Sequence, residues 1–442
     1  KIITLGCKVN TYESEYMLEE LLKSSYIYNE EKPDIIIINT CSVTNMADNK
    51  SLKVVRRVKR ENPNSILVVC GCSVQNNSEK YNDLGIDILI GNREKSKIIS
   101  LIDNYYKTKE KYQYLTKERN LDFEDMKVSK FTTHTRAFIK IQDGCNNFCS
   151  YCIIPYTRGS IRSKDFNKTI EEVKELVENG HKEIVLTGIN TGSYNDNGRD
   201  LSDLLIELAK IKDLERIRIS SIEITELDSK FLNTLKNTPK ICNHLHIPLQ
   251  SGSENILKRM NRKYDKEYFY NKIKEIRNIR EYISITTDCI VGHPYETEDD
   301  FNEYLEFCQK VNFSKIHVFP YSIRVGTASS TMPQGNDNIK KERAKKLIAL
   351  SNELEKEYNK KFIGETLEII TEEEVGDYII GHTSNYLKVY IKGDYKLNST
   401  YKVKIERLEK DNLISYETDR PLSANMGRVL NEKKADIEDV IQ

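Results

Sequence analysis

Three cysteines, Cys145, Cys149 and Cys152, stand within eight residues at the spacing C-x3-C-x2-C. Thiolates this close together can bind three irons of a [4Fe–4S] cluster and leave the fourth iron open. A structural zinc site needs a fourth ligand, and no Cys or His follows at zinc-finger spacing. The spacing therefore favours an iron–sulfur cluster with one open iron over zinc or no metal.

A second trio, Cys7, Cys41 and Cys72, follows three short apolar runs near the start of the sequence. Helical patterns separate these runs, which predicts parallel strands whose carboxyl ends share one edge of a sheet. The three thiols are therefore expected to converge. Cys72 is preferred to Cys70 because Cys70 continues its strand. The alternative is that these cysteines are small buried apolar residues. The runs are residues 2–5, 35–38 and 66–69.

Composition sets limits on the kind of protein. Lys+Arg and Asp+Glu both number 68 in 442 residues, so an RNA site would need local segregation of charge. One predicted helix carries a basic stripe of Lys50, Lys53, Arg57 and Arg60. This stripe could bind phosphates, or it could equally be an ordinary helix face exposed to solvent. No apolar run approaches the ~18 residues of a membrane span. Ten cysteines in ligand spacings favour a reducing cytoplasm over a disulfide framework.

The pattern of strands and helices predicts an α/β protein of several domains. Residues 1–105 are expected to form a three-layer domain with a parallel sheet, completed by a strand at 86–90 and a helix near 94–103. Residues 106–135 lose the pattern and are expected to be a linker.

Residues 136–360 repeat a strand–helix unit six times, which predicts an incomplete (β/α)6 barrel. The loop with Cys145 leaves the first of these strands, so its cluster would lie at the carboxyl ends of the strands, where barrel chemistry occurs. The expected strands are residues 137–141, 183–186, 216–220, 244–248, 283–290 and 315–319.

Other loops on the same rim carry glycines and polar side chains that we expect to contact a cofactor or a substrate. His244 and His246 share a face of the fourth strand, either as a base or, more simply, as interior histidines. The rim residues are Gly188, Asn190, Gln250, Ser251, Gly252, Asp288, Val291, Tyr321 and Arg324.

Residues 361–419 change to short alternating strands, which predict a small β-barrel. Tyr386, Lys388, Tyr390 and Lys392 would share one strand face and offer aromatic and basic groups to RNA; the alternative is a plain capping domain. Residues 420–442 are expected to be a helical or disordered tail without a chemical role.

This order of domains resembles the radical S-adenosylmethionine (SAM) methylthiotransferases over residues 1–418. The resemblance extends to several motifs, and the segment after Cys7 is similar to the branch that modifies N6-threonylcarbamoyladenosine in tRNA. The motifs are GCKVNTYESE at 6–15, NTCSVT at 39–44, IPYTRG at 154–159, PLQSGS at 248–253, FPYS at 319–322 and GHTSNY at 381–386.

The resemblance implies two [4Fe–4S] clusters. The trio from Cys145 to Cys152, with Tyr151 at the aromatic position of the motif, would hold the cluster that cleaves SAM. The trio of Cys7, Cys41 and Cys72 would hold an auxiliary cluster that binds the sulfur to be transferred. One SAM would methylate that sulfur, and a second would yield the radical that abstracts hydrogen from adenine C2 at position 37.

The family also implies partners: the tRNA, a flavodoxin or ferredoxin-like electron donor and a sulfur donor, all in the cytoplasm. Arg158 and Arg162 would meet the SAM carboxylate or an RNA phosphate as forked donors. Tyr321, Arg324, Tyr386 and Lys388 would contact the substrate, the last two from a TRAM-type barrel.

Two departures from the family pattern concern these contacts. His293 and Tyr295 stand where the family generally has Phe and Gly, and Lys164 stands where Arg is usual. Three alternative functions remain: methylthiolation of another tRNA adenosine, methylthiolation of a ribosomal-protein side chain, and non-catalytic RNA binding by a metal-bound protein.

Overall fold

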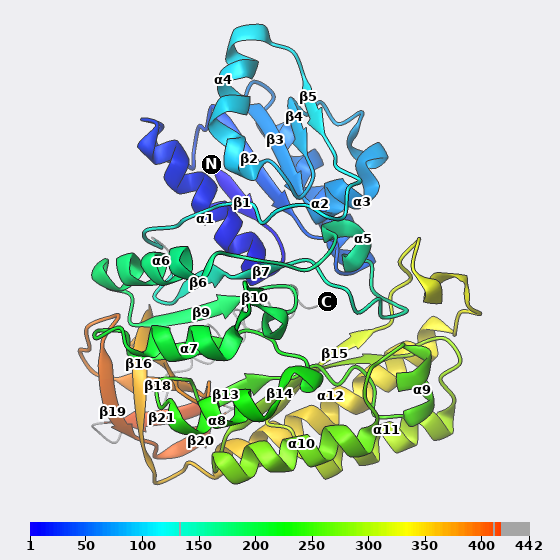
Figure 1. Ribbon diagram of the computed structural model, residues 1–442, viewed down its shortest axis with the longest axis vertical. Coiled ribbons are helices and arrows are strands. Elements are labelled where there is room, and N and C mark those ends of the chain that lie inside the picture. The colour runs from blue at the N-terminus through cyan, green and yellow to red at the C-terminus, as the bar shows by residue number, and fades with distance from the viewer. Residues whose placement is uncertain (132–133, 410–411, 417–442) are drawn as a thin grey trace.

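The first part of the chain is a parallel sheet covered by helices on both faces, at the top of Figure 1. The computed structural model describes residues 1–131, 134–409 and 412–416. The sheet order is β1-β2-β3-β4-β5, with strands Ile2–Thr4, Ile35–Thr40, Ile66–Gly71, Ile88–Ile90 and Tyr112–Tyr114. The helices are α1 (Lys8–Lys23), α2 (Asn45–Glu61), α3 (Cys72–Asn77) and α4 (Ile98–Thr108).

Alternating burial along the strands explains the two helical layers. Ile35 and Ile37 of β2 pack in one apolar cluster with side chains of α1 and α4. Ile36 and Ile38 pack in a second cluster with side chains of α2. Successive strand side chains point to opposite faces, so a continuous apolar run needs a cover on both. This parallel domain confirms the predicted fold class.

The expected linker at 106–135 is wrong in two places. Helix α4 continues to Thr108, and β5 pairs with β4 as a fifth parallel strand. Further along, Met126, Val128 and Phe131 are buried in the main apolar cluster. No local period in the sequence predicts this burial, because packing against distant elements holds these residues in place. The expected tail at 420–442 lies outside the described residues.

Six parallel strands form the open barrel predicted for the middle of the chain. They are ordered β6-β9-β12 and β13-β14-β15, and a bridge between Ile217 and Ile241 joins the two groups. The strands are β6 (Ala137–Lys140), β9 (Glu183–Thr187), β12 (Arg216–Ile219), β13 (His244–His246), β14 (Ser284–Val291) and β15 (Lys315–Pro320).

Helices follow these strands around the outside of the barrel (Figure 1). Their starts are set by polar caps: Asp200 and Asp203 form a capping box at α7, and Thr297 and Asp300 form another at α11. The helices are α6 (Phe166–Glu178), α7 (Leu201–Ala209), α8 (Ser229–Asn237), α9 (Glu254–Arg259), α10 (Lys266–Ile279), α11 (Glu298–Val311) and α12 (Asp337–Lys360). Shorter elements are β7 (Gln142–Asp143), α5 (Ile154–Arg158), β8 (Arg162–Ser163), β10 (Asn195–Asp196) and β11 (Arg199–Asp200).

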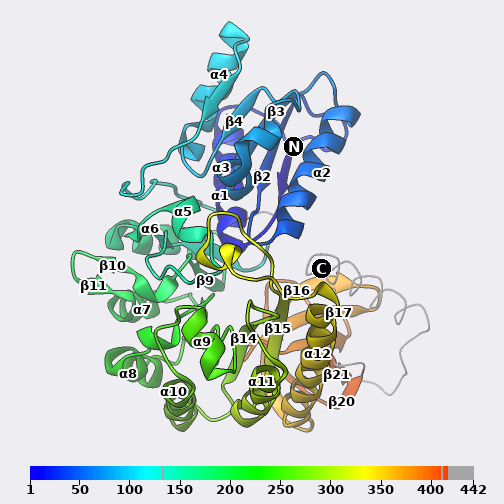
Figure 2. The same cartoon turned by 90° about the vertical axis from the view of Figure 1, so that its right-hand side faces the viewer.

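The C-terminal strands form one sheet in the order β19-β16-β17-β18-β21-β20. The sheet lies beside α12 and below the N-terminal domain in Figure 2. Arg216 of β12 donates to the carbonyl oxygen of His382 at 2.8 Å, and this contact joins the sheet to the barrel. The strands are β16 (Thr366–Val375), β17 (Tyr378–Thr383), β18 (Lys388–Lys392), β19 (Thr400–Lys404), β20 (Arg407–Glu409) and β21 (Asn412–Tyr416).

The expected RNA-binding face of β18 is wrong for Tyr390. This side chain is 2% exposed and belongs to a small apolar cluster with Val375, Tyr378 and Ile380. Period two fixes which residues share a face, but it does not say which face of a curled sheet is covered.

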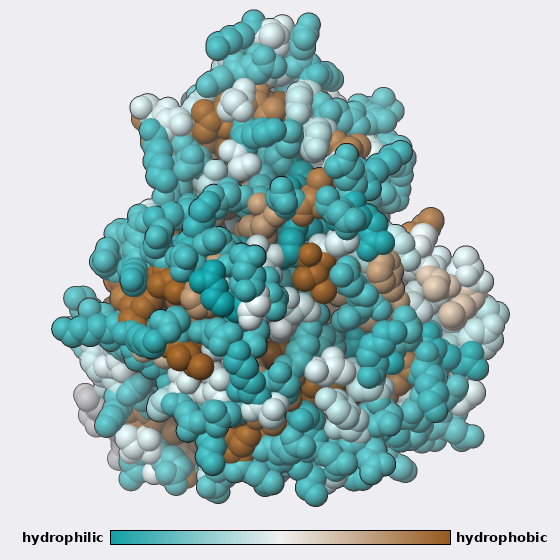
Figure 3. Space-filling view, viewed as in Figure 1, coloured by the Kyte–Doolittle hydropathy of each residue, from teal (hydrophilic) through white to brown (hydrophobic). Residues whose placement is uncertain are grey.

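The surface is mostly hydrophilic, with scattered apolar side chains on the face seen in Figure 3. Within the described ranges, every helix is too short or too polar to span a membrane.

Candidate functional site

A cavity of about 850 Å³ lies where the N-terminal domain, the barrel and the C-terminal sheet meet. All three cysteines of the first domain, Cys7, Cys41 and Cys72, line it. Gly188 and Asp288 line it from the barrel, and Tyr386 and Lys388 line it from the C-terminal sheet. The three cysteines from successive strand ends therefore face one cavity, as parallel strand order requires.

Backbone geometry brings two of these cysteines together. Gly6 has φ +104°, and a Cβ at this position would lie 2.7 Å from Sγ of Cys41. Only glycine allows this approach, so the residue before Cys7 fixes the distance between the two loops. Cys72 begins α3 directly after β3 and lines the cavity, whereas Cys70 is part of the apolar core.

The electrostatics of this trio fit a metal cluster. Burial, together with the neighbouring thiols of Cys7 and Cys72, raises the pKa of Cys41 to about 12. Three thiolates gathered here would repel one another without a bound cation. An iron–sulfur cluster held by Cys7, Cys41 and Cys72 would supply that positive charge. Among the described residues, no three Cys, His, Asp or Glu side chains converge as a single metal ion would require.

The second trio lies in the loop after β7. Gly144 has φ +74°, and a Cβ there would overlap the carbonyl oxygen of Ser160. The amide of Cys152 donates to the carbonyl oxygen of Cys149 at 3.0 Å. Burial raises the pKa of Cys145 to about 11 and that of Cys152 to about 12, so this trio also requires positive charge in order to ionise. These cysteines do not line the 850 Å³ cavity, although Arg158 on the following helix does.

Arg158 and Arg162 are not the free forked donors that were expected. Arg158 Nη1 lies 3.2 Å from both Glu13 Oε1 and Asp143 Oδ1, and its Nη2 donates to Asn10 at 3.2 Å. Arg162 Nη2 lies 2.9 Å from Asp143 Oδ2. Both guanidinium groups are engaged because two buried carboxylates need cationic partners.

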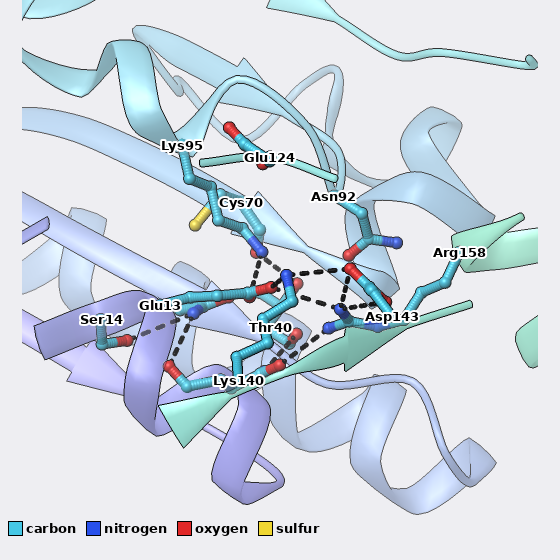
Figure 4. A network of polar contacts seen from close by, with 12 residues as sticks. Glu13, Ser14, Thr40, Cys70, Asn92, Lys95, Glu124, Lys140, Asp143 and Arg158 are labelled. Atoms are coloured by element: carbon cyan, nitrogen blue, oxygen red, sulfur yellow. Dashed lines mark hydrogen bonds and ion pairs between the residues drawn. The ribbon is translucent and has the colours of Figure 1, made fainter. Parts of the chain in front are cut away.

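Figure 4 shows this buried ionic network, with Glu13 and Asp143 among their cationic partners. Glu13 pairs with Lys95 and, at 2.8 Å, with Lys140. Burial alone would raise the pKa of Glu13, but these lysines and Arg158 hold it well below its ordinary value. Asp143, which precedes Gly144, has its pKa lowered by the same kind of partners against the effect of burial. The network therefore fixes α1, which follows Cys7, against the loop that carries Cys145.

Several rim residues have structural contacts outside the cavity. Val291 is a core residue, and Tyr321 donates to Ser329 at 2.9 Å. Arg324 Nη1 pairs with Asp48 Oδ2 at 2.6 Å and so ties the barrel to α2. These three positions do not line the cavity, because loop sequence alone does not show which side chains turn inward.

The rim residues Gln250, Ser251, Gly252 and Asn190 make contacts within the protein. Gln250 has φ +65°, and its carbonyl oxygen accepts from Tyr304 at 2.9 Å. Ser251 and Gly252 follow in the same turn, which packs against α11. Asn190 donates to Glu226 Oε1 at 2.7 Å.

Two of the three residues that depart from the family pattern, His293 and Lys164, make interior contacts. His293 Nε2 lies 3.3 Å from Ser150 Oγ, so it packs against the loop of Cys149. Lys164 is buried, pairs with Glu172 and donates to the carbonyl oxygen of Met126 at 2.6 Å. Tyr295 is 48% exposed at the surface.

Histidines form a polar wall of the cavity. His246 Nε2 lies 3.2 Å from Asp288 Oδ2, and its Nδ1 lies 2.9 Å from Thr286 Oγ1. His317, which was not predicted, lies 5.7 Å from His246 between ring centroids, and burial lowers its pKa to about 4. Burial also holds the pKa of His244 well below its ordinary value, so both are neutral at pH 7. Alternation along β15 puts His317 on the same face of the strand as Lys315, and both residues line the cavity.

Tyr386 closes the cavity from the C-terminal sheet. It has φ +66°, and its ring stacks on His382 with centroids 5.2 Å apart. The guanidinium carbon of Arg218 lies 4.6 Å from the ring centroid and that of Arg136 lies 5.1 Å away. Burial raises the pKa of Tyr386, but Arg136, Lys8 and Arg218 outweigh it, so the net pKa is lowered.

Two further residues were missed by the sequence analysis. Arg262 donates from Nη1 to Sγ of Cys149 at 3.2 Å. Lys8 lines the cavity next to Cys7. The sequence signal for Lys8 was its place directly after Cys7, a candidate ligand, whereas Arg262 has no such local signal.

The chain matches two known protein families and resembles a solved structure. Residues 139–308 match the Radical SAM superfamily, and residues 1–91 match the Uncharacterized protein family UPF0004. The structure of the radical S-adenosylmethionine methyltransferase TsrM from Kitasatospora setae has a TM-score of 0.55 at 12% identity, covering 74% of this chain and 76% of that one, which indicates a shared fold.

Two relatives match almost end to end. The threonylcarbamoyladenosine tRNA methylthiotransferase MtaB of Bacillus subtilis (strain 168) is 42% identical over 419 residues, covering 91% of this chain and 92% of its own length. The tRNA-2-methylthio-N(6)-dimethylallyladenosine synthase of Pelotomaculum thermopropionicum is 35% identical over 413 residues, covering 90% and 92%. The chain therefore belongs to the radical-SAM methylthiotransferase family.

Proposed function

We propose that this enzyme inserts a methylthio group at C2 of N6-threonylcarbamoyladenosine 37 in tRNA. The observation that carries the proposal is the convergence of Cys7, Cys41 and Cys72 in a cavity large enough for a modified nucleoside. The 42% identity to a threonylcarbamoyladenosine tRNA methylthiotransferase over 91% of the chain supports the choice of substrate.

Membership of the superfamily implies a [4Fe–4S] cluster and SAM. We assign that cluster to Cys145, Cys149 and Cys152 and an auxiliary cluster to the trio in the cavity. The first cluster with SAM would supply a 5′-deoxyadenosyl radical, and the auxiliary cluster would hold the sulfur for transfer.

The protein's own groups position the substrate and exclude water. Tyr386 lines the cavity, and its contacts with His382, Arg136 and Arg218 hold its ring in place. The pair of His246 and Asp288 supplies hydrogen-bonding groups at the cavity wall. The ionic network around Glu13 keeps the loops of both trios in a constant relative position.

The other partners follow from the reaction. Electrons would come from a flavodoxin or ferredoxin-like protein, and sulfur from a separate donor. The C-terminal sheet would act as a TRAM-type domain that contacts tRNA, with Lys388 at the border of the cavity.

The cavity offers polar partners for a threonylcarbamoyl group, because Lys8, His244, His246 and Asp288 are among the residues that line it.

Mass spectrometry of tRNA nucleosides tests the proposal. Deleting the gene should abolish 2-methylthio-N6-threonylcarbamoyladenosine and leave its precursor to accumulate. The wild-type gene should restore the product, and a Cys41→Ala copy should not. Unchanged levels of the methylthio nucleoside after deletion would reject the proposal.

A further inference from the structure

Lys8 is a cation in the cavity without a counter-ion among the described residues. It lines the cavity directly after Cys7, and its ammonium forms no ion pair or hydrogen bond with any residue that the structure describes. Two other lining cations are paired, Arg158 with Glu13 and Lys315 with Glu355 at 3.0 Å, and the ammonium of Lys388 lies over the ring of Tyr390.

The surroundings of Lys8 make an anion favourable there. It is the first residue of α1, where the helix dipole is positive and the first turn contains no acidic side chain. The guanidinium groups of Arg136 and Arg218 lie against the ring of Tyr386, which lines the same cavity as Lys8. A desolvated ammonium among other positive charges is costly unless a ligand brings negative charge into the cavity.

We propose that Lys8 binds the carboxylate of the threonylcarbamoyl group and thereby selects this nucleoside over adenosines without that charge. The inference rests on the proposed function and extends it to a specificity-determining residue. N6 and C2 flank N1 on the same edge of adenine, so a base that presents C2 to the cysteine trio brings its N6 substituent to the same part of the cavity. Lys8 is adjacent in sequence to one member of that trio.

Two other anions are less suited to this position. The SAM carboxylate belongs with the cluster of Cys145, Cys149 and Cys152, none of which lines this cavity. RNA phosphates lie on the sugar side of the nucleotide, away from C2. A carboxylate on the base edge therefore fits the place of Lys8 best.

The test combines a change in the protein with a change in the ligand. The cluster-loaded enzyme is titrated with three anticodon stem-loops that carry threonylcarbamoyladenosine, its methyl ester or unmodified adenosine at position 37. Wild type should bind the acid about tenfold or more tightly than the ester, as expected for a hydrogen bond to a charged group. Lys8→Gln should remove that difference while binding the ester as wild type does. Lys8→Arg should keep most of it.

Lys23→Gln is the matched control, because Lys23 is exposed at the other end of α1 and pairs with Glu19. Iron content verifies that each variant retains its clusters. Equal weakening of all three RNAs by Lys8→Gln would indicate a phosphate contact and overturn the inference, as would an acid preference that survives in that variant. If wild type itself forms no methylthio product from the acid-bearing RNA, the proposed function fails and the assignment of Lys8 falls with it.

Discussion

Arg262 donates a hydrogen bond from Nη1 to Sγ of Cys149 at 3.2 Å, and its Nη2 pairs with Glu223. The guanidinium is almost fully buried, with its side chain 3% exposed. A permanent positive charge thus contacts one sulfur of the proposed SAM-cleaving cluster. Hydrogen bonds and charge at cluster sulfurs are among the factors that set reduction potential.

Replacing Arg262 with Gln should therefore make this cluster harder to reduce. We expect four irons to remain at the site, while the midpoint potential becomes more negative by on the order of tens of mV, as lost charge and hydrogen bonding at a sulfur predict. A redox titration followed by electron paramagnetic resonance measures the shift. Lys263→Gln, a change at the adjacent exposed lysine, is the control and should leave the potential in place. An unshifted potential in Arg262→Gln would contradict the role given to this contact.

Measured iron content should show that the two cysteine trios each hold a cluster independently of the other. Anaerobic reconstitution should give near eight irons per chain, falling by about four in Cys7→Ala and by about four in Cys145→Ala. Cys70→Ala serves as the control because Cys70 is a core residue two positions from Cys72. A loss of iron in Cys70→Ala equal to that in Cys7→Ala would mean that the first trio has been assigned wrongly.

Glu13 should dominate the acid sensitivity of the N-terminal domain. Its pKa is lower in the folded state than its ordinary value of 4.5, so its contribution to stability is present above pH 4.5 and is lost as the pH falls. Glu13→Gln should destabilise by about 3–5 kcal/mol at pH 7, because it leaves buried cations without their partner. Urea unfolding at several pH values measures this, and the gap to wild type should narrow below pH 4.5.

Glu20→Gln on the exposed side of α1 is the comparison for Glu13. Glu20 pairs only with Lys23 at the surface, so its loss should change stability by less than about 0.5 kcal/mol. Equal effects of the two substitutions would show that the buried network is not what stabilises this domain.

The contribution of Glu226 to the free energy of unfolding should change with pH in the opposite direction to that of Glu13. Burial raises its pKa to about 7 although Ser193 and Asn190 donate hydrogen bonds to it. The folded state therefore binds this proton more readily than the unfolded state, and stability falls as the pH rises from 4.5 to about 7. Glu226→Gln should remove that part of the slope in thermal unfolding measured across this range. Glu207→Gln on the exposed face of α7 should retain the wild-type slope.

Much of the fold was predictable because apolar runs and helical periods are local. The six strands of the barrel lie within a few residues of their predicted bounds. The linker was not predictable in the same way, because Val128 is ordered by a hydrogen bond from its amide to Glu172, 44 residues away, and by burial in a distant core. The prediction that Tyr390 lies on an exposed face of β18 was wrong for a related reason, since side chains from neighbouring strands of its own sheet cover it.

The amino-acid sequence alone determined the two cysteine trios and the strand ends that carry them, because ligand spacing and strand period are properties of short segments. Tertiary structure alone decided what surrounds them. Arg158 has carboxylate partners from α1 and β7, Arg262 reaches Cys149 from 113 residues away, and Lys8 faces a cavity made by three parts of the chain. Whether a charged side chain is neutralised or left available to a ligand depends on such distant contacts, which no local pattern encodes.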